Sequence, residues 1–212
     1  QAWIILILIW EDVLHQSFWQ ELVIKSSEDM ILRMMIQTRT MIQHILDMVP
    51  IEPEGKAIVE NLQKKNYSVF GLTHRGMALA MRTIHQLKNT GFSFSRSFPQ
   101  RDDALVLNPR GVVYTKGVLF TAGTNKGTAM MKFFDHIGYK TQHVVAVDDL
   151  LKNLTEIEAE CQKRKIEFVG LRFAKLDEHL KKFDPKIADL QTEQVFNLLS
   201  NQTAKEMLKK SR

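Results

Sequence analysis

The stretch SVFGLTHRG, residues 68–76, decides the fold, because an apolar run ends there directly in polar side chains. Its apolar part has the pattern of a strand buried in a parallel sheet. Thr73, His74 and Arg75 then bring a hydroxyl, an imidazole and a guanidinium to one strand end. Such a set suits an anion-binding site, and it equally suits a polar strand end followed by a helix cap.

Apolar, β-branched runs of the same kind recur along the chain and predict further buried strands, at residues 4–10, 118–121, 143–147 and 166–173. Helical patterns lie between these runs, at residues 77–88, from Thr124 or Asn125 to His136, and from Leu150 to about Lys163. The alternation of strand and helix predicts an α/β fold with a doubly wound, mainly parallel sheet.

Two segments interrupt this alternation. Residues 28–49 carry apolar side chains at helical spacing and are too long for a plain crossover, so we expect a small helical cap-type insertion over residues 19–50. Residues 108–111, Asn-Pro-Arg-Gly, are of types that favour a turn, and they lie between two segments in which apolar and polar residues alternate. They predict a β-hairpin. We therefore expect one domain over residues 1–212, with the cap inserted into it.

Composition narrows the possible classes of protein. Cys161 is the single cysteine of the 212 residues, so the chain has no internal disulfide. The apolar run at residues 2–10 is much shorter than the roughly 20 residues that span a bilayer, and we expect no transmembrane segment. The net charge of +5 permits acidic partners, but aromatic residues are not interleaved with the basic ones, so we expect no nucleic-acid partner.

Polar side chains follow the predicted strands where doubly wound sheets bind ligands, beyond the carboxyl ends of the strands. The second strand ends at Thr73, and the hairpin strand leads to Asn125 and Lys126 at a helix start. A hydroxyl, an ammonium and backbone amides can together hold a phosphate group. We expect Asn125 to contact the substrate, together with His74 and Arg75, which could alternatively serve as helix-cap residues.

A pair of carboxylates, Asp148 and Asp149, follows the fourth strand. Two adjacent carboxylates repel each other unless a cation lies between them, although such a pair often only caps the next helix. Oxygen ligands suit Mg²⁺, which one or two carboxylates and a phosphate usually hold in proteins. The sequence therefore predicts a phosphate site with magnesium on Asp148 and Asp149.

An apolar strand that ends in a threonine, then a lysine, then an apolar strand that ends in two aspartates (hhhhT…K…hhhhDD, where h is an apolar residue) resembles motifs two, three and four of the haloacid-dehalogenase-like (HAD) hydrolases. The resemblance looks closer still to a bacterial branch of that superfamily known as a domain of unknown function. It implies that Thr73 contacts the transferred phosphoryl group, that Lys126 neutralises nucleophile and phosphate, and that Asp148, assisted by Asp149, holds magnesium. The resemblance covers roughly residues 48–191, at VPIEPEGKAIVENLQKKNYSVFGLTHRG, GVLFTAGTNKG, VVAVDDLLKNL, FVGLRF and FDPKIADLQ.

The first HAD motif, DxDx[TV], is not recognisable in this chain. Aligning Val13 with the last position of the motif places Ile9 at the nucleophile position and Glu11 at the acid/base position. Isoleucine cannot form an acyl phosphate, whereas the family attacks phosphorus with an aspartate. Three interpretations stay open: the motif has decayed, the chain begins after it, or Glu11 or Asp12 takes its place in a shifted register.

We therefore expect a magnesium-dependent phosphohydrolase that acts through an aspartyl-phosphate on a phosphorylated small molecule or a phosphoprotein. The alternative is a catalytically inactive pseudoenzyme of the same fold that serves as a protein-binding module. The resemblance further implies a bacterial protein, located in the cytoplasm or exported to a host cell.

Overall fold

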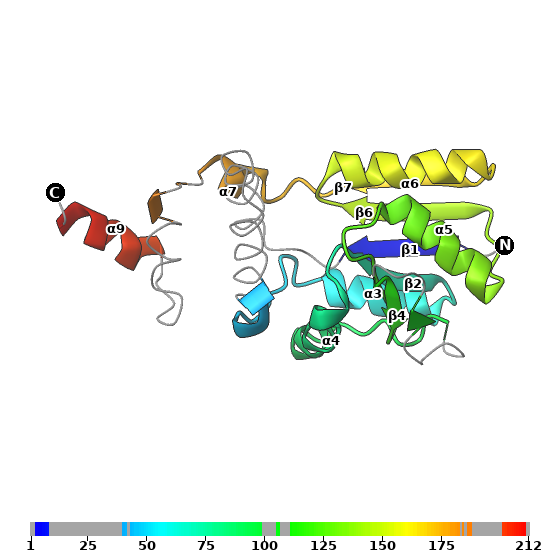
Figure 1. The fold of residues 1–212 in the computed structure, drawn as a ribbon, viewed down its shortest axis with the longest axis horizontal. Helices are drawn as coiled ribbons and strands as arrows, with labels where there is room; N and C mark the ends of the chain where they lie inside the picture. The colour runs from blue at the N-terminus through cyan, green and yellow to red at the C-terminus, as the bar shows by residue number, and fades with distance from the viewer. Residues whose placement is uncertain are drawn as a thin grey trace. The chain divides into compact units, whose positions relative to one another are not determined.

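A computed structural model gives the fold of the chain (Figure 1). It describes residues 3–8, 40–41, 43–98, 105–106, 111–182, 184, 186–187 and 201–210. The contacts divide the chain into two compact units, the first made of residues 1–11 and 46–174 and the second of residues 12–45 and 175–212. Most of the predicted cap, residues 19–50, lies outside the described residues, and the single-domain organisation stays a prediction.

The first unit is built on one sheet of seven described strands in the order β3-β4-β5-β2-β1-β6-β7. Their bounds are β1 Trp3–Leu8, β2 Ser68–Thr73, β3 Leu105–Val106, β4 Val113–Thr115, β5 Val118–Phe120, β6 His143–Asp148 and β7 Glu167–Arg172. From β5 through β2, β1 and β6 to β7 each neighbouring pair is parallel, whereas β4 pairs antiparallel with both β5 and β3. The chain therefore has an α/β fold with a mixed sheet, and each predicted strand is confirmed over its described residues.

Helices cover both faces of this sheet. Alternate residues of a strand point to opposite faces, and in β2 Phe70 packs into one core cluster while its neighbour Val69 packs into the other. The first cluster contains Phe133 and Ile157 from two helices, and the second contains Val59 from another. The helices of the first unit are α3 Gly55–Lys64, α4 Ala80–Asn89, α5 Lys126–Ile137 and α6 Leu151–Lys163. In the first cluster α5 and α6 pack on one face, and in the second α3 and α4 pack on the other.

The hairpin predicted around residues 108–111 is present, because β3 pairs antiparallel with β4 on either side of that turn. A second hairpin, between β4 and β5, was missed. Lys116 (φ 49°) and Gly117 (φ 80°) both have positive φ, as the tightest hairpin turns require. Gly117 is also required by space, since a Cβ there would lie 1.9 Å from the carbonyl oxygen of Phe94.

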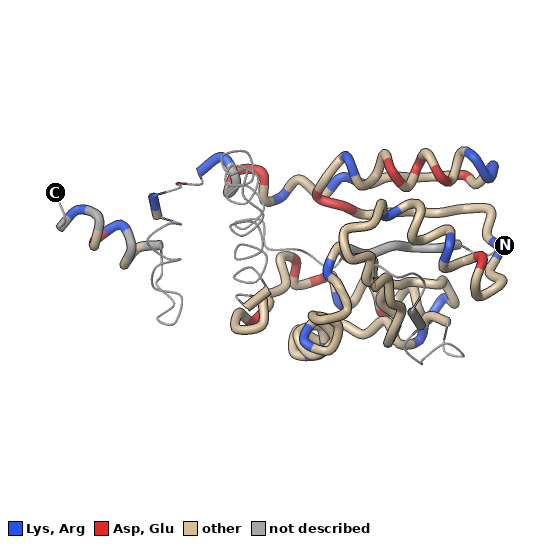
Figure 2. The backbone as a smooth tube through the Cα atoms, in the orientation of Figure 1, with Lys and Arg blue, Asp and Glu red and all other residues tan. Residues whose placement is uncertain are grey.

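The second unit contributes α7 Asp177–Lys181 and α9 Asn201–Lys210 to the described residues. Basic residues recur along α9, as Figure 2 shows, in agreement with the basic tail visible in the sequence. Within the described residues, no helix combines the length and the apolar character that crossing a membrane demands.

Candidate functional site at the carboxyl ends of the strands

The predicted site residues that the structure describes lie where β2 and β6 end and where α5 begins. β1 lies between the other two strands, and its arrow in Figure 1 points toward this edge. Leu8 pairs with Leu72, the residue before Thr73, and Ile7 pairs with Val147, the residue before Asp148. Thr73 and Asp148 therefore flank the end of β1, two strand spacings or roughly 10 Å apart.

A buried ion pair forms the centre of the site. The Lys126 ammonium lies 3.2 Å from Oδ2 of Asp148, and the two side chains are only 5% and 0% exposed. Since a lone buried charge is strongly destabilising, each of these groups needs the other. The structure thus brings together the lysine and the aspartate that the sequence placed at two separate strand ends.

The helix start that carries Lys126 is fixed by three local features. Asn125 caps α5, and its side-chain oxygen accepts a hydrogen bond from the backbone N–H of Thr128 at 2.9 Å. The backbone N–H of Lys126 donates to Oε2 of Glu156 on α6 at 3.1 Å. Gly127 lets the two helices approach, because a Cβ there would lie 2.2 Å from the carbonyl oxygen of Glu156. Asn125, predicted to bind substrate, is thus observed as a helix cap.

Asp148 is held rigidly on its other side. Its Oδ1 accepts hydrogen bonds from the backbone N–H of Leu150 at 2.8 Å and from the side-chain amide of Asn153 at 3.0 Å. Together with Lys126, three donors therefore surround this carboxylate. The contact with Leu150 also shows that Asp148 supports the turn that leads into α6, and its role as a magnesium ligand stays a prediction.

Asp149 lies beside this carboxylate in an unfavourable position. Burial, and then the adjacent Asp148 carboxylate, raise the pKa of Asp149 to about 6, although Lys126 acts in the opposite direction. A cation placed between the two carboxylates would relieve this repulsion. Their oxygen-only donor set fits magnesium, which accepts one or two carboxylates and completes its shell with water or phosphate. Within the described residues, no cluster of three or more His, Cys, Asp or Glu side chains could hold a metal ion.

Thr73 is completely buried at the end of β2, and its hydroxyl accepts a hydrogen bond from the backbone N–H of Arg75 at 3.2 Å. The carbonyl of Thr73 accepts from the backbone N–H of Thr121 at 2.8 Å, which ties the loop before α5 to β2. His74 is half-buried, and its carbonyl accepts from the backbone N–H of Gly123 at 3.2 Å. The two loops that carry Thr73 and Lys126 are thus joined by backbone hydrogen bonds.

Arg75 is buried and points toward α4. Its Nη1 donates to Oγ1 of Thr83 at 3.0 Å and to Oε1 of Gln86 at 2.7 Å, and the Gln86 amide donates in turn to the carbonyl of Leu46 at 2.6 Å. These contacts give Arg75 a structural role. They do not test its predicted contact with substrate, which stays a prediction.

Two hydroxyls for which the sequence predicted no role in the site lie in the loop before α5. Oγ1 of Thr121 and Oγ1 of Thr124 are buried without a hydrogen-bond partner in the described part of the chain. Both belong to the stretch TAGTN that links β5 to α5, so the signal was a pair of threonines within the five residues before Lys126. They add hydroxyl donors to a loop already tied to Thr73.

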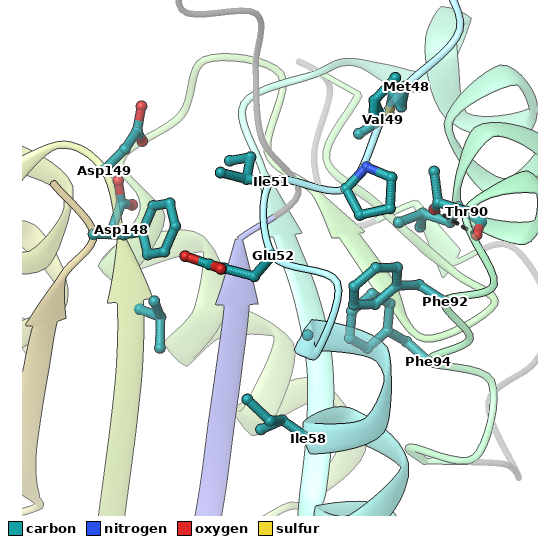
Figure 3. A pocket seen from close by; sticks show the side chains of 15 residues that line it. Met48, Val49, Ile51, Glu52, Ile58, Thr90, Phe92, Phe94, Asp148 and Asp149 are labelled. Atoms are coloured by element: carbon teal, nitrogen blue, oxygen red, sulfur yellow. Dashed lines mark hydrogen bonds between the residues drawn. The ribbon is translucent and has the colours of Figure 1, made fainter. Parts of the chain in front are cut away.

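A pocket of about 330 Å³ opens beside the carboxylates (Figure 3). Its described lining is mostly apolar and comes from residues 48–52, from α3 and the end of α4, and from the ends of β6 and β7. The described lining residues are Met48, Val49, Pro50, Ile51, Glu52, Gly55, Ile58, Leu87, Thr90, Phe92, Phe94, Val147, Asp148, Asp149 and Phe173. This pocket was not predicted from the sequence, because its walls come from segments far apart in the chain.

The residues expected at the first motif, Ile9, Glu11 and Asp12, lie outside the described part of the chain.

Comparison with known proteins finds relatives in Chlamydia. A Chlamydia pneumoniae protein named "Putative outer membrane protein" is 27% identical over 168 residues, and a Chlamydia trachomatis protein of the same name is 25% identical over 169 residues. The matches cover 79% and 80% of this chain but 63% and 61% of the relatives, so the chain spans about three fifths of their length. The family profile described as "Protein of unknown function (DUF2608)" matches residues 5–205, and the chain belongs to this family.

Proposed function

We propose that the chain is a HAD-like, magnesium-dependent phosphohydrolase. The observation that carries this proposal is the buried Lys126–Asp148 pair at the carboxyl end of β6, with Asp149 beside it. The sheet supports it as well, because parallel strands with helices on both faces are what a doubly wound HAD-like fold requires.

Different residues of the described site would bind different parts of a phosphate ester. Lys126 offsets the charge of the phosphoryl group, while Thr73 and the amides after it donate hydrogen bonds to its oxygens. Asp148 and Asp149 would hold magnesium, which would supply further positive charge at the phosphoryl group. In the net reaction the bond between phosphorus and the ester oxygen breaks, that oxygen leaves with a proton as the alcohol, and water supplies the new oxygen of inorganic phosphate.

The attacking carboxylate is the part of the proposal that rests on sequence alone. Glu11 and Asp12 follow the end of β1 closely in the chain, and β1 ends between Thr73 and Asp148. A carboxylate delivered there could attack the phosphorus atom of a bound ester. Turnover by this chain therefore requires Glu11 or Asp12 to take the place of the missing aspartate.

A pseudoenzyme is the second candidate, and the identity of Ile9 favours it. Isoleucine at the nucleophile position would leave a site that binds phosphate and magnesium but transfers nothing. Such a protein would act through binding, with a phosphorylated small molecule or a phosphoprotein as its partner. The Chlamydia relatives support a bacterial origin, and a location in the bacterial cytoplasm or in a host cell stays a prediction.

A phosphatase assay on the full chain with 4-nitrophenyl phosphate, with and without magnesium, tests the proposal. We expect magnesium-dependent turnover that Asp148→Asn abolishes and that Asp47→Asn, an exposed aspartate of the same unit, leaves unchanged. Loss of turnover in Glu11→Gln or in Asp12→Asn identifies the attacking group.

Absence of turnover overturns the hydrolase and leaves the second candidate. That candidate then requires phosphate to raise the melting temperature in the presence of magnesium, and requires Asp148→Asn to remove the effect. Gain of turnover in Ile9→Asp would show that only the nucleophile had been lost. Absence of both turnover and stabilisation would contradict both candidates.

A further inference from the structure

We propose that the apolar pocket beside Asp148 receives the leaving group of the phosphate ester, and that this group is aromatic or otherwise apolar. The inference rests on the proposed function, because it assigns the phosphoryl group to the strand-end site. It names the substrate class: monoesters of an apolar alcohol or a phenol, as opposed to sugar or polyol phosphates.

The pocket is continuous with the strand-end site. Asp148 and Asp149 line the pocket and are also the proposed magnesium ligands. Figure 3 shows both at one end of the pocket, at the tip of β6, with Phe92 and Phe94 at the other end. A ligand whose phosphoryl group lies at Asp148 would therefore extend its remaining atoms into the pocket.

The chemistry of the walls selects an apolar group. Phe92 and Phe94 stack with ring centroids 6.5 Å apart and an angle of 25° between their planes, and they present ring surface to the cavity. A sugar or polyol placed against such walls would lose hydrogen bonds to water without replacing them. An aromatic ring would instead gain contact with the rings and the aliphatic side chains. The volume of about 330 Å³ suits a small ligand.

Apolar surface at the edge of the pocket is left open to water. Val49 is 78% exposed and Ile58 is 54% exposed, and both line the cavity. Large exposed apolar side chains that gather around one cavity are a common mark of a binding site. An apolar leaving group would cover part of this surface.

The carboxylates at one end of the pocket restrict which apolar ligands can enter. Glu52 lines the pocket together with Asp148 and Asp149, and in Figure 3 its carboxylate points toward the tip of β6. These groups would repel a ligand that carries its own carboxylate, such as a fatty acid or an aryl acid. They would admit a neutral phenol, and they would admit a phosphate ester only together with a cation.

Calorimetric titration of the full chain with separate probes tests the inference. 1-Naphthol reports on the pocket, inorganic phosphate with magnesium reports on the strand-end site, and 1-naphthyl phosphate with magnesium reports on both. We expect Phe92→Ala to weaken 1-naphthol and 1-naphthyl phosphate binding roughly 10-fold or more and to leave inorganic phosphate unchanged. We expect Asp148→Asn to abolish binding of inorganic phosphate.

Two further variants keep the test sound if Phe92→Ala disturbs folding. Ile58→Gln changes a half-exposed side chain of the pocket edge and should reproduce the effect on 1-naphthol. Met81→Gln is the matched control, because Met81 is 73% exposed on α4 and lies outside the described lining. We also expect 1-naphthoate to bind at least 10-fold more weakly than 1-naphthol.

The outcomes separate the two proposals. If phosphate binds with magnesium but 1-naphthol does not bind, or binds Phe92→Ala and Ile58→Gln as tightly as the unchanged protein, the inference is wrong and the proposed function stands. If 1-naphthol binds as expected but inorganic phosphate never does, the proposed function is overturned, and the assignment of the pocket to a phosphate ester falls with it.

Discussion

Replacing Asp149 by asparagine should stabilise the protein in the absence of divalent cations. The pKa of this carboxyl is raised from 3.8 to about 6, first by burial and then by Asp148. The unfolded chain therefore loses this proton at a lower pH than the folded protein does, so stability falls as the pH rises from about 4 through 6. The shift corresponds to about 3 kcal/mol, fully present below the unfolded pKa and lost above the folded one.

Urea denaturation in EDTA at several pH values between 4 and 8 measures this effect. Asp149→Asn cannot ionise, so its unfolding free energy should lack the fall of about 3 kcal/mol that the unchanged protein shows. At pH 7.5 the variant should melt roughly 6–12 °C higher in a chain of this size. Asp47→Asn is the control, because Asp47 is 76% exposed and its exposed ion pair contributes little.

Added magnesium should reduce the difference in stability between the two proteins. A cation bound between the carboxylates stabilises only the form in which Asp149 is charged, so added magnesium should raise the melting temperature of the unchanged protein more than that of Asp149→Asn. If the stability curves of the two proteins run parallel from pH 4 to 8, the carboxylate pair is not strained as described. The assignment of the cation to this pair would then lose its physical basis.

Two further substitutions test the framework of the site. Gly127→Ala should destabilise the protein by about 3 kcal/mol in urea denaturation, because its Cβ meets the Glu156 carbonyl at 2.2 Å, whereas Gly138→Asn, in open space at the end of α5, should cost much less. Arg75→Met should cost about 2–3 kcal/mol, since two buried acceptors lose a charged donor, and should leave the affinity of the folded protein for phosphate unchanged. A loss of phosphate affinity without a loss of stability would instead indicate that Arg75 contacts the substrate.

The sequence allowed the strands, the helices α4, α5 and α6 and the ends of α5 to be predicted, because each has a local cause, whereas α3 was not predicted. Asn125 caps α5, as its residue type indicated, and the helix ends close to the predicted His136, followed by Gly138 in the left-handed conformation. The hairpin at Lys116 and Gly117 was missed because consecutive apolar residues flank the two-residue turn on both sides and look like one run. Its need for glycine comes from the carbonyl of Phe94, a contact that no local pattern displays.

In the candidate site, likewise, the features with a local cause could be predicted from the sequence and those that depend on distant residues could not. Thr73 and Asp148 end their strands and Lys126 begins the helix after β5, so the topology rule places them at one edge of the sheet. The direction of the Arg75 side chain depends on Thr83 and Gln86 of another helix, and the apolar pocket depends on walls from several segments. Contacts of this kind are fixed by tertiary packing and leave no periodic trace in the sequence.

The position of β1 has a consequence for the synthesis of the protein. Its two neighbours in the sheet, β2 and β6, come much later in the chain, and about 135 residues separate the end of β1 from the start of β6. At about 5–20 residues per second, a ribosome needs roughly 7–27 s to make that length. Throughout this time the strand WIILIL lacks one of its two partners, so the nascent chain carries an aggregation-prone segment that a chaperone can shield until the sheet closes.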